Sequence, residues 1–426
     1  MNEKKQPDIR FQGFYGDWEK KEFLNAFDPS IPTNTLSRAN LNYEQGAVKN
    51  IHYGDVLIKF GQITDVLKEE IPFITDADIT KYKNQFLENG DIIFADAAED
   101  EAVGKATEIS GITDEKVVSG LHTIACRPIE STSTGYWGYY LNSSAYHNQL
   151  LPLMQGIKVL SISKRSLATT FVNYPNEENE QIKIGELFKS LDNLIALNQS
   201  KYDKLISMKK ACLEKMFPKD GADTPEIRFK GFSGKWEEKK LGEVAKLGSS
   251  KRVHREDYRE TGVPFFRGLE ISKLGSSSKI NDILYISFNH YNDLKEKYGV
   301  PKAGDILITA VGTIGNCYLL YDNKPFYFKD GNLIWISDIQ VNSLFLSIYL
   351  NDAVGKKRVL DSAVGSNQKA LTMIKLETVK ITLPGVKEQE KISAFFKNID
   401  NLITLRKTEL DKQKSIKKAL LEKMFI

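Results

Sequence analysis

The chain has 426 residues, more than one domain usually holds, and its composition, 41% hydrophobic and 27% charged, is that of an ordinary folded protein. Lys plus Arg number 59 against 56 Asp plus Glu, so a net charge of +3 neither supports nor excludes a polyanionic partner. Cys126, Cys212 and Cys317 form no C-x-x-C pair, and no stretch approaches the ~20 apolar residues that span a bilayer, so we expect a cytoplasmic protein with no membrane partner.

The two halves of the chain repeat each other at their ends. The segment IRFQGFYGDWEKKEF from Ile9 matches IRFKGFSGKWEEKKL from Ile227. Likewise, IGELFKSLDNLIALNQSKYDKLISMKKACLEKMF from Ile184 matches ISAFFKNIDNLITLRKTELDKQKSIKKALLEKMF from Ile392. More than half of the aligned positions are identical in each pair, whereas the regions between share only short echoes. The sequence therefore predicts a tandem repeat in which one frame carries two different cores.

One of these echoes is a Gly-Asp turn. The stretch NGDIIFADAAEDEAVGK from Asn89 predicts a short apolar strand after the turn, and AGDILITAVGTIGN from Ala303 does the same in the second core. Asp91 and Asp305 therefore have a sufficient structural role as turn residues, and we do not expect them to be catalytic acids.

An aromatic stretch, STGYWGYYLNS, follows later in the first core and includes Tyr136, Trp137 and Tyr139. Aromatic residues at this density are typical of a core. The alternative is that the glycines between them let the rings approach a backbone or a base. Just upstream, GLHTIACRP contributes two polar candidates, His122 and Arg127.

Apolar residues recur at steps of three and four from residue 184 and again from residue 392. This spacing predicts two long helices, over residues 179–218 and 387–426, with a coiled-coil seam. Closed two-fold symmetry favours an antiparallel pair in which each helix covers the other. The first seam positions are Ile184, Phe188, Leu191 and Ile195 in one helix and Ile392, Phe396, Ile399 and Ile403 in the other.

Polar residues interrupt the seam at Asn198, Arg406, Gln413 and Lys417. They either fix the register of the helix pair or lie in solvent near a frayed end, and the sequence favours neither interpretation. A second apolar set widens the stripe beyond a two-helix seam, which indicates a further partner. Its members are Leu187, Leu194 and Leu197 in the first helix and Phe395, Leu402 and Leu405 in the second.

Two polar patterns mark the second core, and for each a solvated loop or a plain turn is the ordinary structural interpretation. The first is basic and consists of Lys251, Arg252, His254, Arg255 and, after an apolar run, Arg267. The second follows Gly365 and consists of Ser366, Asn367, Gln368 and Lys369.

Sequence motifs for catalysis are missing. The chain has no G-x-x-x-x-G-K-[ST], no G-x-G-x-x-G after a strand, no H-E-x-x-H and no Asn-Pro-Pro-aromatic motif of the kind that amino-methyltransferases use. Its five histidines show no metal-ligand spacing. The sequence therefore favours a binding protein without catalytic residues, bound metal or cofactor of its own.

Two unlike cores in a repeated frame, each followed by a long helix, resemble the specificity subunit of type I restriction-modification enzymes over essentially the whole chain. The resemblance is carried by the duplicated I-R-F-x-G-F-x-G-x-W and F-K-x-[LI]-D-N-L-I motifs, by the closing LEKMF, and by SSKRVHREDYRETGVPFFRGLEI and GSNQKALT in the second core. It implies a mixed α/β (α+β) fold in which two target recognition domains, residues 1–178 and 219–386, are joined by the two antiparallel coiled-coil helices as a pseudo-two-fold repeat.

The resemblance also implies partners: double-stranded DNA, two modification (methyltransferase) subunits, and restriction (translocase and nuclease) subunits. Each domain would read one half of a bipartite DNA site, and the helices would set the spacing and dock the modification subunits. S-adenosylmethionine, ATP and Mg would belong to the partner subunits. Candidate DNA-binding residues are Lys251, Arg252, His254, Arg255, Arg267, Ser366, Asn367, Gln368 and Lys369 in the second domain, and His122, Arg127, Tyr136, Trp137 and Tyr139 in the first.

Charge fits DNA binding less well in the first domain. Acidic residues outnumber basic ones over residues 1–178, whereas basic residues prevail over 219–386. Either the basic residues of the first domain gather on one face, or partner subunits neutralise the phosphates there. Two other functions stay open: a coiled-coil scaffold whose domains bind proteins, and a fused restriction-methyltransferase enzyme, for which the chain is short and poor in motifs.

Overall fold

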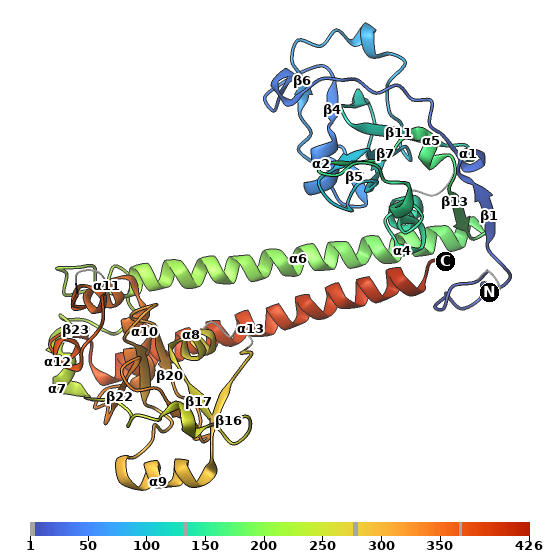
Figure 1. Ribbon diagram of the computed structural model, residues 1–426. Helices are drawn as coiled ribbons and strands as arrows, with labels where there is room; N and C mark the ends of the chain where they lie inside the picture. Colours follow the sequence, from blue (N-terminus) through green and yellow to red (C-terminus); the bar gives the residue numbers. More distant parts are fainter. Residues whose placement is uncertain (1–4, 131–134, 276–279, 366–368) are drawn as a thin grey trace. The chain divides into compact units, whose positions relative to one another are not determined.

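The chain folds into two compact units, which are described one after the other (Figure 1). Unit 1 consists of Met1–Ser200 and Thr408–Ile426, and unit 2 of Lys201–Lys407. The structure is a computed structural model, and it describes residues 5–130, 135–275, 280–365 and 369–426.

Unit 1 consists mainly of small β-sheets. A five-stranded sheet has the order β2-β11-β7-β9-β5, antiparallel except for the β5–β9 pair. Its strands are β2 (Phe27–Asp28), β5 (Ile63–Asp65), β7 (Ile92–Ala95), β9 (Ala106–Ser110) and β11 (Thr123–Pro128). A second sheet, β10-β4-β6-β3, contains β3 (Leu41–Asn42), β4 (Lys49–Ile51), β6 (Phe73–Ile74) and β10 (Val117–Ser119). Two-stranded sheets pair β1 (Glu19–Glu22) with β13 (Phe171–Tyr174), and β8 (Ala97–Ala98) with β12 (Leu160–Ser161).

Short helices connect these strands, and one of them is the aromatic stretch. The helices are α1 (Phe23–Ala26), α2 (Tyr53–Ile58), α3 (Tyr136–Tyr140), α4 (Ser144–His147) and α5 (Lys164–Leu167), with 3-10 turns at Arg38–Asn40, Ile79–Tyr82 and Leu151–Leu153. The rings of α3 lie in the core of unit 1 with side chains of β7 and β11. Gly138 allows this close packing, because a Cβ there would lie 2.2 Å from the carbonyl oxygen of Gln62.

Unit 2 has an analogous mixture of sheets and helices. One sheet, β15-β22-β19-β20, contains β15 (Lys246–Gly248), β19 (Ile306–Thr309), β20 (Cys317–Leu319) and β22 (Leu333–Ser337). Another, β16-β18-β17-β21, contains β16 (Tyr258–Arg259), β17 (Val263–Phe266), β18 (Leu284–Ile286) and β21 (Tyr327–Phe328), and β14 (Glu237–Lys240) pairs with β23 (Lys380–Leu383). The helices are α7 (Leu241–Val244), α8 (Gly268–Gly275), α9 (Phe288–Tyr298), α10 (Ser343–Asn351), α11 (Ala353–Asp361) and α12 (Met373–Glu377), with a 3-10 turn at Arg255–Asp257.

The paired Gly-Asp turns have the structural role predicted for them. Asp91 precedes the buried strand β7, and its Oδ2 accepts a hydrogen bond from the backbone N–H of Glu88 at 2.7 Å. Asp305 precedes the buried strand β19, and its Oδ2 accepts from the backbone N–H of Lys302 and from Trp335 Nε1, both at 2.9 Å. Both carboxylates therefore cap a turn, as the sequence predicts.

Two long helices, α6 (Glu178–Met216) and α13 (Val386–Lys423), each contribute one part to each unit; they are green and red in Figure 1. Proline limits both, because α6 ends just before Pro218 and α13 begins just after Pro384. Each first turn carries acidic residues, which the positive end of the helix dipole favours.

The predicted seam is covered along its whole length. Each seam position, from Ile184 to Met216 along α6 and from Ile392 along α13 to Met424 just after its end, is buried or half-buried. Ile184, Phe188 and Phe396 are almost completely inaccessible to solvent. Helix periodicity was therefore sufficient to identify the contact face of both helices.

Polar seam residues pair across the two helices within each unit. In unit 1, Asn198 Nδ2 donates to Gln413 Oε1 at 3.0 Å, and Lys417 Nζ lies 2.5 Å from Asp192 Oδ1. In unit 2, Lys209 Nζ lies 2.6 Å from Asp400 Oδ1. Residue numbers fall along one helix as they rise along the other, so the pair is antiparallel, and paired polar residues favour register fixing over fraying.

A duplicated arginine clasp ties the start of each repeat to a long helix. In unit 1, Arg10 Nε and Nη2 donate to both oxygens of the buried Glu180 at 2.7 and 2.8 Å, while Nη1 donates to the carbonyl of Gly16. In unit 2, Arg228 makes the same contacts to Glu388 and to the carbonyl of Gly234. The arginine of the I-R-F motif therefore makes the same clasp in both repeats.

The two LEKMF segments end the long helices, as predicted, and each packs in the unit of the other repeat's core. Phe425, from the second copy, lies among the aromatic rings of unit 1, 5.8 Å from Tyr136 and 5.7 Å from Tyr140. Phe217, from the first copy, lies 5.6 Å from Phe345 in unit 2. A copy of LEKMF is thus the end of one repeat in sequence and part of the core of the other in space.

Candidate nucleic-acid interface

The basic segment of unit 2 is a loop that is anchored at its start and by the buried Val253. Before it, the hydroxyl of Ser250 donates to the carbonyl of Phe328 at 2.6 Å, and the backbone N–H of Lys251 donates to the hydroxyl of Tyr327 at 2.9 Å. Val253 is 6% exposed and lies in the core under the β16-β18-β17-β21 sheet. The loop therefore has a fixed backbone.

Four basic side chains of this loop face solvent. Lys251, Arg252, His254 and Arg255 are all exposed, and among the described residues none of the four pairs with a carboxylate side chain through its charged group. The backbone N–H of His254 donates to Asp257 at 3.3 Å and starts a 3-10 turn. We call these four residues the basic loop; the unneutralised charges of Lys251, Arg252 and Arg255 are what phosphates require.

Helix α9 adds an aromatic side chain that sequence reasoning missed. Lys251 Nζ lies 5.6 Å from the ring centroid of Tyr298, within cation-π range, and Tyr298 is itself exposed. Phe288, at the start of the same helix, is 60% exposed. Nothing in the sequence connects residues 251 and 298, because only the fold brings them together.

Arg267 is occupied within the structure. Its guanidinium contacts both oxygens of Glu270, which is 1% exposed, with Nη2 to Oε1 at 2.5 Å, and its backbone N–H donates to Glu270 Oε2 at 2.7 Å. Although burial acts to raise the pKa of Glu270, the hydrogen bonds from Arg267 lower it overall. Arg267 thus stabilises the start of α8, and its role in DNA binding stays a prediction.

Arg127 in unit 1 is similarly engaged. Nε and Nη2 donate to the two oxygens of the buried Asp91 at 2.8 Å each, and Nη1 lies 2.9 Å from Glu88. These carboxylates raise the pKa of Arg127, chiefly through the hydrogen bond with Asp91. The same arginine therefore holds the Gly-Asp turn in place.

His122 is the more accessible candidate of the first domain. Its backbone has a φ of 56°, and its Nδ1 lies 3.1 Å from Asp96 Oδ1. The ring is half exposed and packs edge-on against Tyr53. Burial raises the pKa of Asp96, while His122 acts to lower it. His122 therefore belongs to a small polar surface group that remains free to contact a ligand.

The aromatic candidates lie in the core. Tyr136, Trp137 and Tyr139 are at most 2% exposed. The Tyr136 hydroxyl donates to the carbonyl of Asn173 at 2.9 Å, and the Tyr139 hydroxyl donates to Asp192 at 2.7 Å. No ring face of these three residues is open to a base, so the structure favours the core over contact with a base.

Ser366, Asn367 and Gln368 lie outside the described residues. Their neighbour Lys369 is exposed, beside a two-residue bridge in which Val364 and Ala370 exchange backbone hydrogen bonds at 2.8 and 2.9 Å. The prediction for this turn therefore remains open.

Basic residues of unit 1 are partly used inside the unit. The ammonium of the half-buried Lys105 donates to the carbonyls of Leu57 and Phe60 at 3.0 Å, and burial lowers the pKa of Lys105. Lys59 pairs with Glu70 at 3.1 Å. These residues are thus less available to phosphates than their number in the sequence indicates.

The described part of the chain contains neither a candidate metal site nor a helix that could span a membrane. No group of three or more His, Cys, Asp or Glu side chains there could hold a metal ion. No helix within the described ranges is both long and apolar enough to cross a membrane.

Comparisons with known proteins point to one family. The family model described as "Type I restriction modification DNA specificity domain" matches residues 233–414. A type I restriction enzyme specificity subunit of Haemophilus influenzae is 33% identical over 168 residues, which are 38% of this chain and 41% of that protein. The MjaX specificity subunit of Methanocaldococcus jannaschii is 25% identical over 422 residues, 95% of this chain and 92% of that protein.

Solved structures share the fold. A type I restriction-modification S subunit from M. genitalium superimposes with a TM-score of 0.54, at 16% identity and 99% coverage of both chains. A chain from a study of complex assembly in the type I system gives a TM-score of 0.51 at 17% identity, with 96% of this chain and 97% of that chain covered. The predicted mixed α/β fold, with two globular parts and two long antiparallel helices, is confirmed.

The resemblance inferred from the duplicated motifs is therefore confirmed: residues 233–414 match the family model of the type I DNA specificity domain, and over most of its length the chain is similar to a specificity subunit of a type I restriction-modification system.

Proposed function

We propose that each target recognition domain of this specificity subunit reads one half of a bipartite DNA site, while α6 and α13 set the spacing between the halves. The recognition domains are residues 1–178 and 219–386, and the helical segments are 179–218 and 387–426. The observation that carries the proposal is the repeat itself: one frame, clasped twice by Arg10 and Arg228, holds two cores of unlike sequence. A DNA site whose two halves differ in sequence requires two different recognition domains on one frame.

Contacts with DNA in the second domain start from the basic loop. Its four unpaired basic side chains and the neighbouring Tyr298 offer charge for phosphates and a ring for stacking. Arginine can also read guanine through two hydrogen bonds, a contact that discriminates by about 1–3 kcal/mol. In the first domain, His122 is the best-exposed candidate, and partner subunits neutralise most phosphates near its acidic surface.

Two modification subunits dock on the helices. Leu194 and Leu197 are 43% and 51% exposed on α6, and their counterparts Leu402 and Leu405 are 44% and 52% exposed on α13. Leucines three positions apart lie on one helical face, and apolar side chains repeated at such exposure mark protein contacts. Two equal leucine pairs fit two copies of the same partner.

Catalysis belongs to the partners. A specificity subunit is itself non-catalytic. Methylation with S-adenosylmethionine, and ATP- and Mg-dependent translocation and cleavage, are assigned to the modification and restriction subunits. The family match argues against the alternative of a coiled-coil scaffold whose domains bind proteins, because the matching family is one of DNA specificity domains.

Co-expression with a modification subunit and genome-wide mapping of methylated adenines tests the proposal. The expected result is one motif with two fixed parts and a spacer of constant length. An uninterrupted motif, or methylation without sequence preference, would refute bipartite reading.

Introduction of negative charge on the helices tests docking separately. Leu194→Glu with Leu197→Glu should reduce the mass of the assembly by one modification subunit, and Leu402→Glu with Leu405→Glu should do the same. Ser190→Glu, an exposed polar position on α6, is the matched control. Full assembly by both leucine variants would place the docking surface elsewhere.

A further inference from the structure

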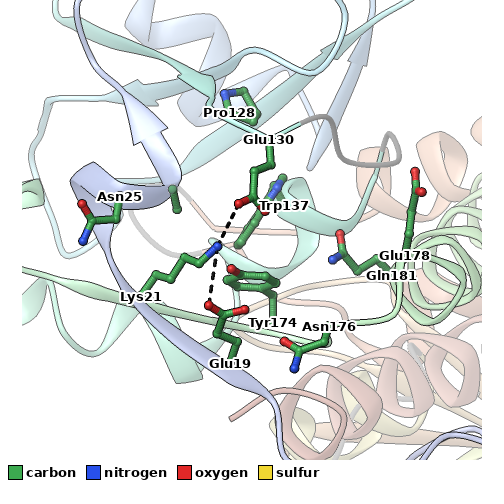
Figure 2. A pocket seen from close by; sticks show the side chains of 11 residues that line it. Glu19, Lys21, Asn25, Pro128, Glu130, Trp137, Tyr174, Asn176, Glu178 and Gln181 are labelled. Atoms are coloured by element: carbon green, nitrogen blue, oxygen red, sulfur yellow. Dashed lines mark hydrogen bonds and ion pairs between the residues drawn. The ribbon is translucent and has the colours of Figure 1, made fainter.

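Several basic side chains of the first recognition domain are neutralised within the fold. Arg10 and Arg127 each donate to both oxygens of a buried carboxylate. Lys21 pairs with Glu130 at 3.0 Å and with Glu19 at 3.6 Å, as the dashed lines of Figure 2 show. These three cations are therefore engaged inside the domain and contribute little free charge to its surface.

Arg38 is held in a different way. Its Nη2 donates to Asp55 Oδ1 at 2.6 Å, and its Nη1 donates to the hydroxyl of Tyr43 at 3.3 Å. Asp55 Oδ2 has no hydrogen-bond partner among the described residues, so this carboxylate holds one guanidinium nitrogen rather than two. A guanidinium has five N–H donors, and the contacts of Arg38 in the described part of the chain use two, which leaves three for a ligand.

Asp55 supports this arginine from below the surface. The carboxylate residue is 4% exposed and lies in the first turn of α2, whereas the side chain of Arg38 is 44% exposed. An arginine side chain has many rotamers, and a buried carboxylate behind it restricts them. Less entropy is therefore lost when the planar fork of Arg38 binds a ligand.

The backbone of Arg38 is fixed as well. Arg38 begins the 3-10 turn Arg38–Asn40, in which the N–H of Asn40 donates to the carbonyl of Ser37 at 3.0 Å. Strand β3 follows directly, and the carbonyl of Asn40 accepts from the N–H of Thr75, just after β6, at 2.9 Å. Backbone and side chain are therefore both positioned before a ligand binds.

Arg38 lies close to the region of His122, the exposed candidate of this domain. The ring of Tyr53 lies 4.6 Å from the ring of His52 and 5.3 Å from that of His122. Burial lowers the pKa of His52, and the charges of Arg38 and His122 act in the same direction, while Asp55 opposes them. Arg38 and His122 are therefore both near His52 and belong to one region of the domain.

The second domain has an arginine at the equivalent position of the repeated frame. Helices α2 and α8 contact β7 and β19, the strands that follow the two Gly-Asp turns. Asp55 is the buried acid in the first turn of α2, and Glu270 is its counterpart in α8. Asp55 binds Arg38, which lies 17 residues away in sequence. Glu270 binds Arg267, which lies three residues away. Different chain segments thus bring an arginine to the same position in both domains, as expected if that position faces a common kind of ligand.

We propose that Arg38 reads guanine in the half-site of the first recognition domain, through the N–H groups that Asp55 and Tyr43 leave free. This assignment rests on the proposed function and deepens it, since it gives one base pair of the half-site to one side chain. Guanine presents two acceptors, O6 and N7, in the major groove, and one guanidinium can donate to both. The competing role for Arg38 is a phosphate contact, which positions the protein but reads no sequence.

A double variant separates the two roles. Arg38→Ala combined with Asp55→Asn removes the guanidinium and leaves no buried charge unpaired. After co-expression with the modification subunit, maps of methylated adenines should show one G·C position of one half-site become degenerate. The other positions of that half, the spacer and the second half should be retained.

Arg165→Ala is the matched control, since Arg165 is exposed in the same domain and no carboxylate side chain among the described residues pairs with it. Its methylation motif should equal that of the wild type. A wild-type motif without two halves would contradict the proposed function. A bipartite wild-type motif that the double variant leaves unchanged would contradict the role of Arg38 alone.

Modified DNA provides a second measurement that does not depend on the folding of a variant. In the half-site that is retained when residues 219–386 are exchanged, each guanine is replaced in turn by 7-deazaguanine, which lacks the N7 acceptor. Binding by the wild-type complex should weaken roughly tenfold at one guanine, within the range for one bidentate contact. At that guanine the double variant should lose nothing further.

Three results would overturn the assignment. The first is that no guanine of this half-site is sensitive to the loss of N7. The second is that the double variant methylates every site more weakly but keeps its motif, which would identify a phosphate contact. The third is that several positions of the half-site become degenerate together, which would show a general disturbance of the domain rather than the loss of one base contact.

Discussion

Removal of the aromatic ring from one copy of LEKMF should destabilise one unit and spare the other. Phe425 is 2% exposed and packs against Trp18, Tyr136, Tyr140 and Phe188 at centroid distances of 5.6–6.5 Å. Replacement of a buried phenylalanine by alanine costs about 3–5 kcal/mol. Since a domain is stable by about 5–15 kcal/mol, Phe425→Ala should bring unit 1 close to unfolding.

Hydrogen exchange measured by mass spectrometry separates the two units. In Phe425→Ala, the core strands of unit 1, such as β7, should lose protection, while β19 of unit 2 keeps it. In Phe217→Ala, β19 should lose protection and β7 should keep it, because Phe217 packs with Phe345 and Phe396.

Leu405→Ala is the control, since Leu405 is about half exposed on α13 and its truncation should change stability by less than about 0.5 kcal/mol. A sequential interpretation of the repeat, in which each LEKMF supports the core before it, predicts the opposite pattern. Loss of protection in β7 rather than β19 after Phe217→Ala would refute the exchange of segments described here.

Three further predictions concern pH, the clasp and DNA. Burial raises the pKa of Glu108 from 4.5 to about 7, although hydrogen bonds from the backbone N–H groups of Gly135 and Gly138 act to lower it. Between these two pH values the folded state therefore keeps a proton that the unfolded state has lost. The stabilisation is complete below pH 4.5 and falls as pH rises to 7, by roughly 3 kcal/mol; urea midpoints of unit 1 between pH 5 and 8 should show this slope, and a flat profile would contradict it. Arg228→Ala leaves the buried Glu388 unpaired and should lower the stability of unit 2 by about 3–5 kcal/mol. Adding Glu388→Gln should recover part of this loss. A melting temperature equal to that of the wild type in the single variant would exclude a stabilising clasp. Lys251→Ala and Arg255→Ala should each lower the salt dependence of DNA binding by the assembled complex by about one in the log-log slope, and an unchanged slope would remove the basic loop from the interface.

The long helices could be predicted from the sequence because their packing depends on local periodicity. Steps of three and four residues identified Ile184, Phe188, Ile392 and Phe396, all of which are buried. The role of Asn198 could not be decided in this way, since its partner Gln413 is distant in sequence. In the sequence, a polar residue at a seam position looks the same whether its side chain is paired across the helices or solvated.

Site residues were harder to predict because charge and aromaticity do not reveal partners. Arg127 and Arg252 are both basic residues in the sequence, yet only Arg127 is held by a buried carboxylate. The aromatic stretch had two interpretations until its burial was known. Tyr298 became a candidate only through its position beside Lys251.

Exchange of one recognition domain tests most directly whether the two domains read DNA independently. Residues 219–386 would be replaced by the corresponding domain of a family member with a different target, and methylated adenines would be mapped after co-expression with the modification subunit. We predict that one half of the methylation motif changes, while the other half and the spacer length are retained. A motif that changes in both halves, or that does not change, would contradict the account.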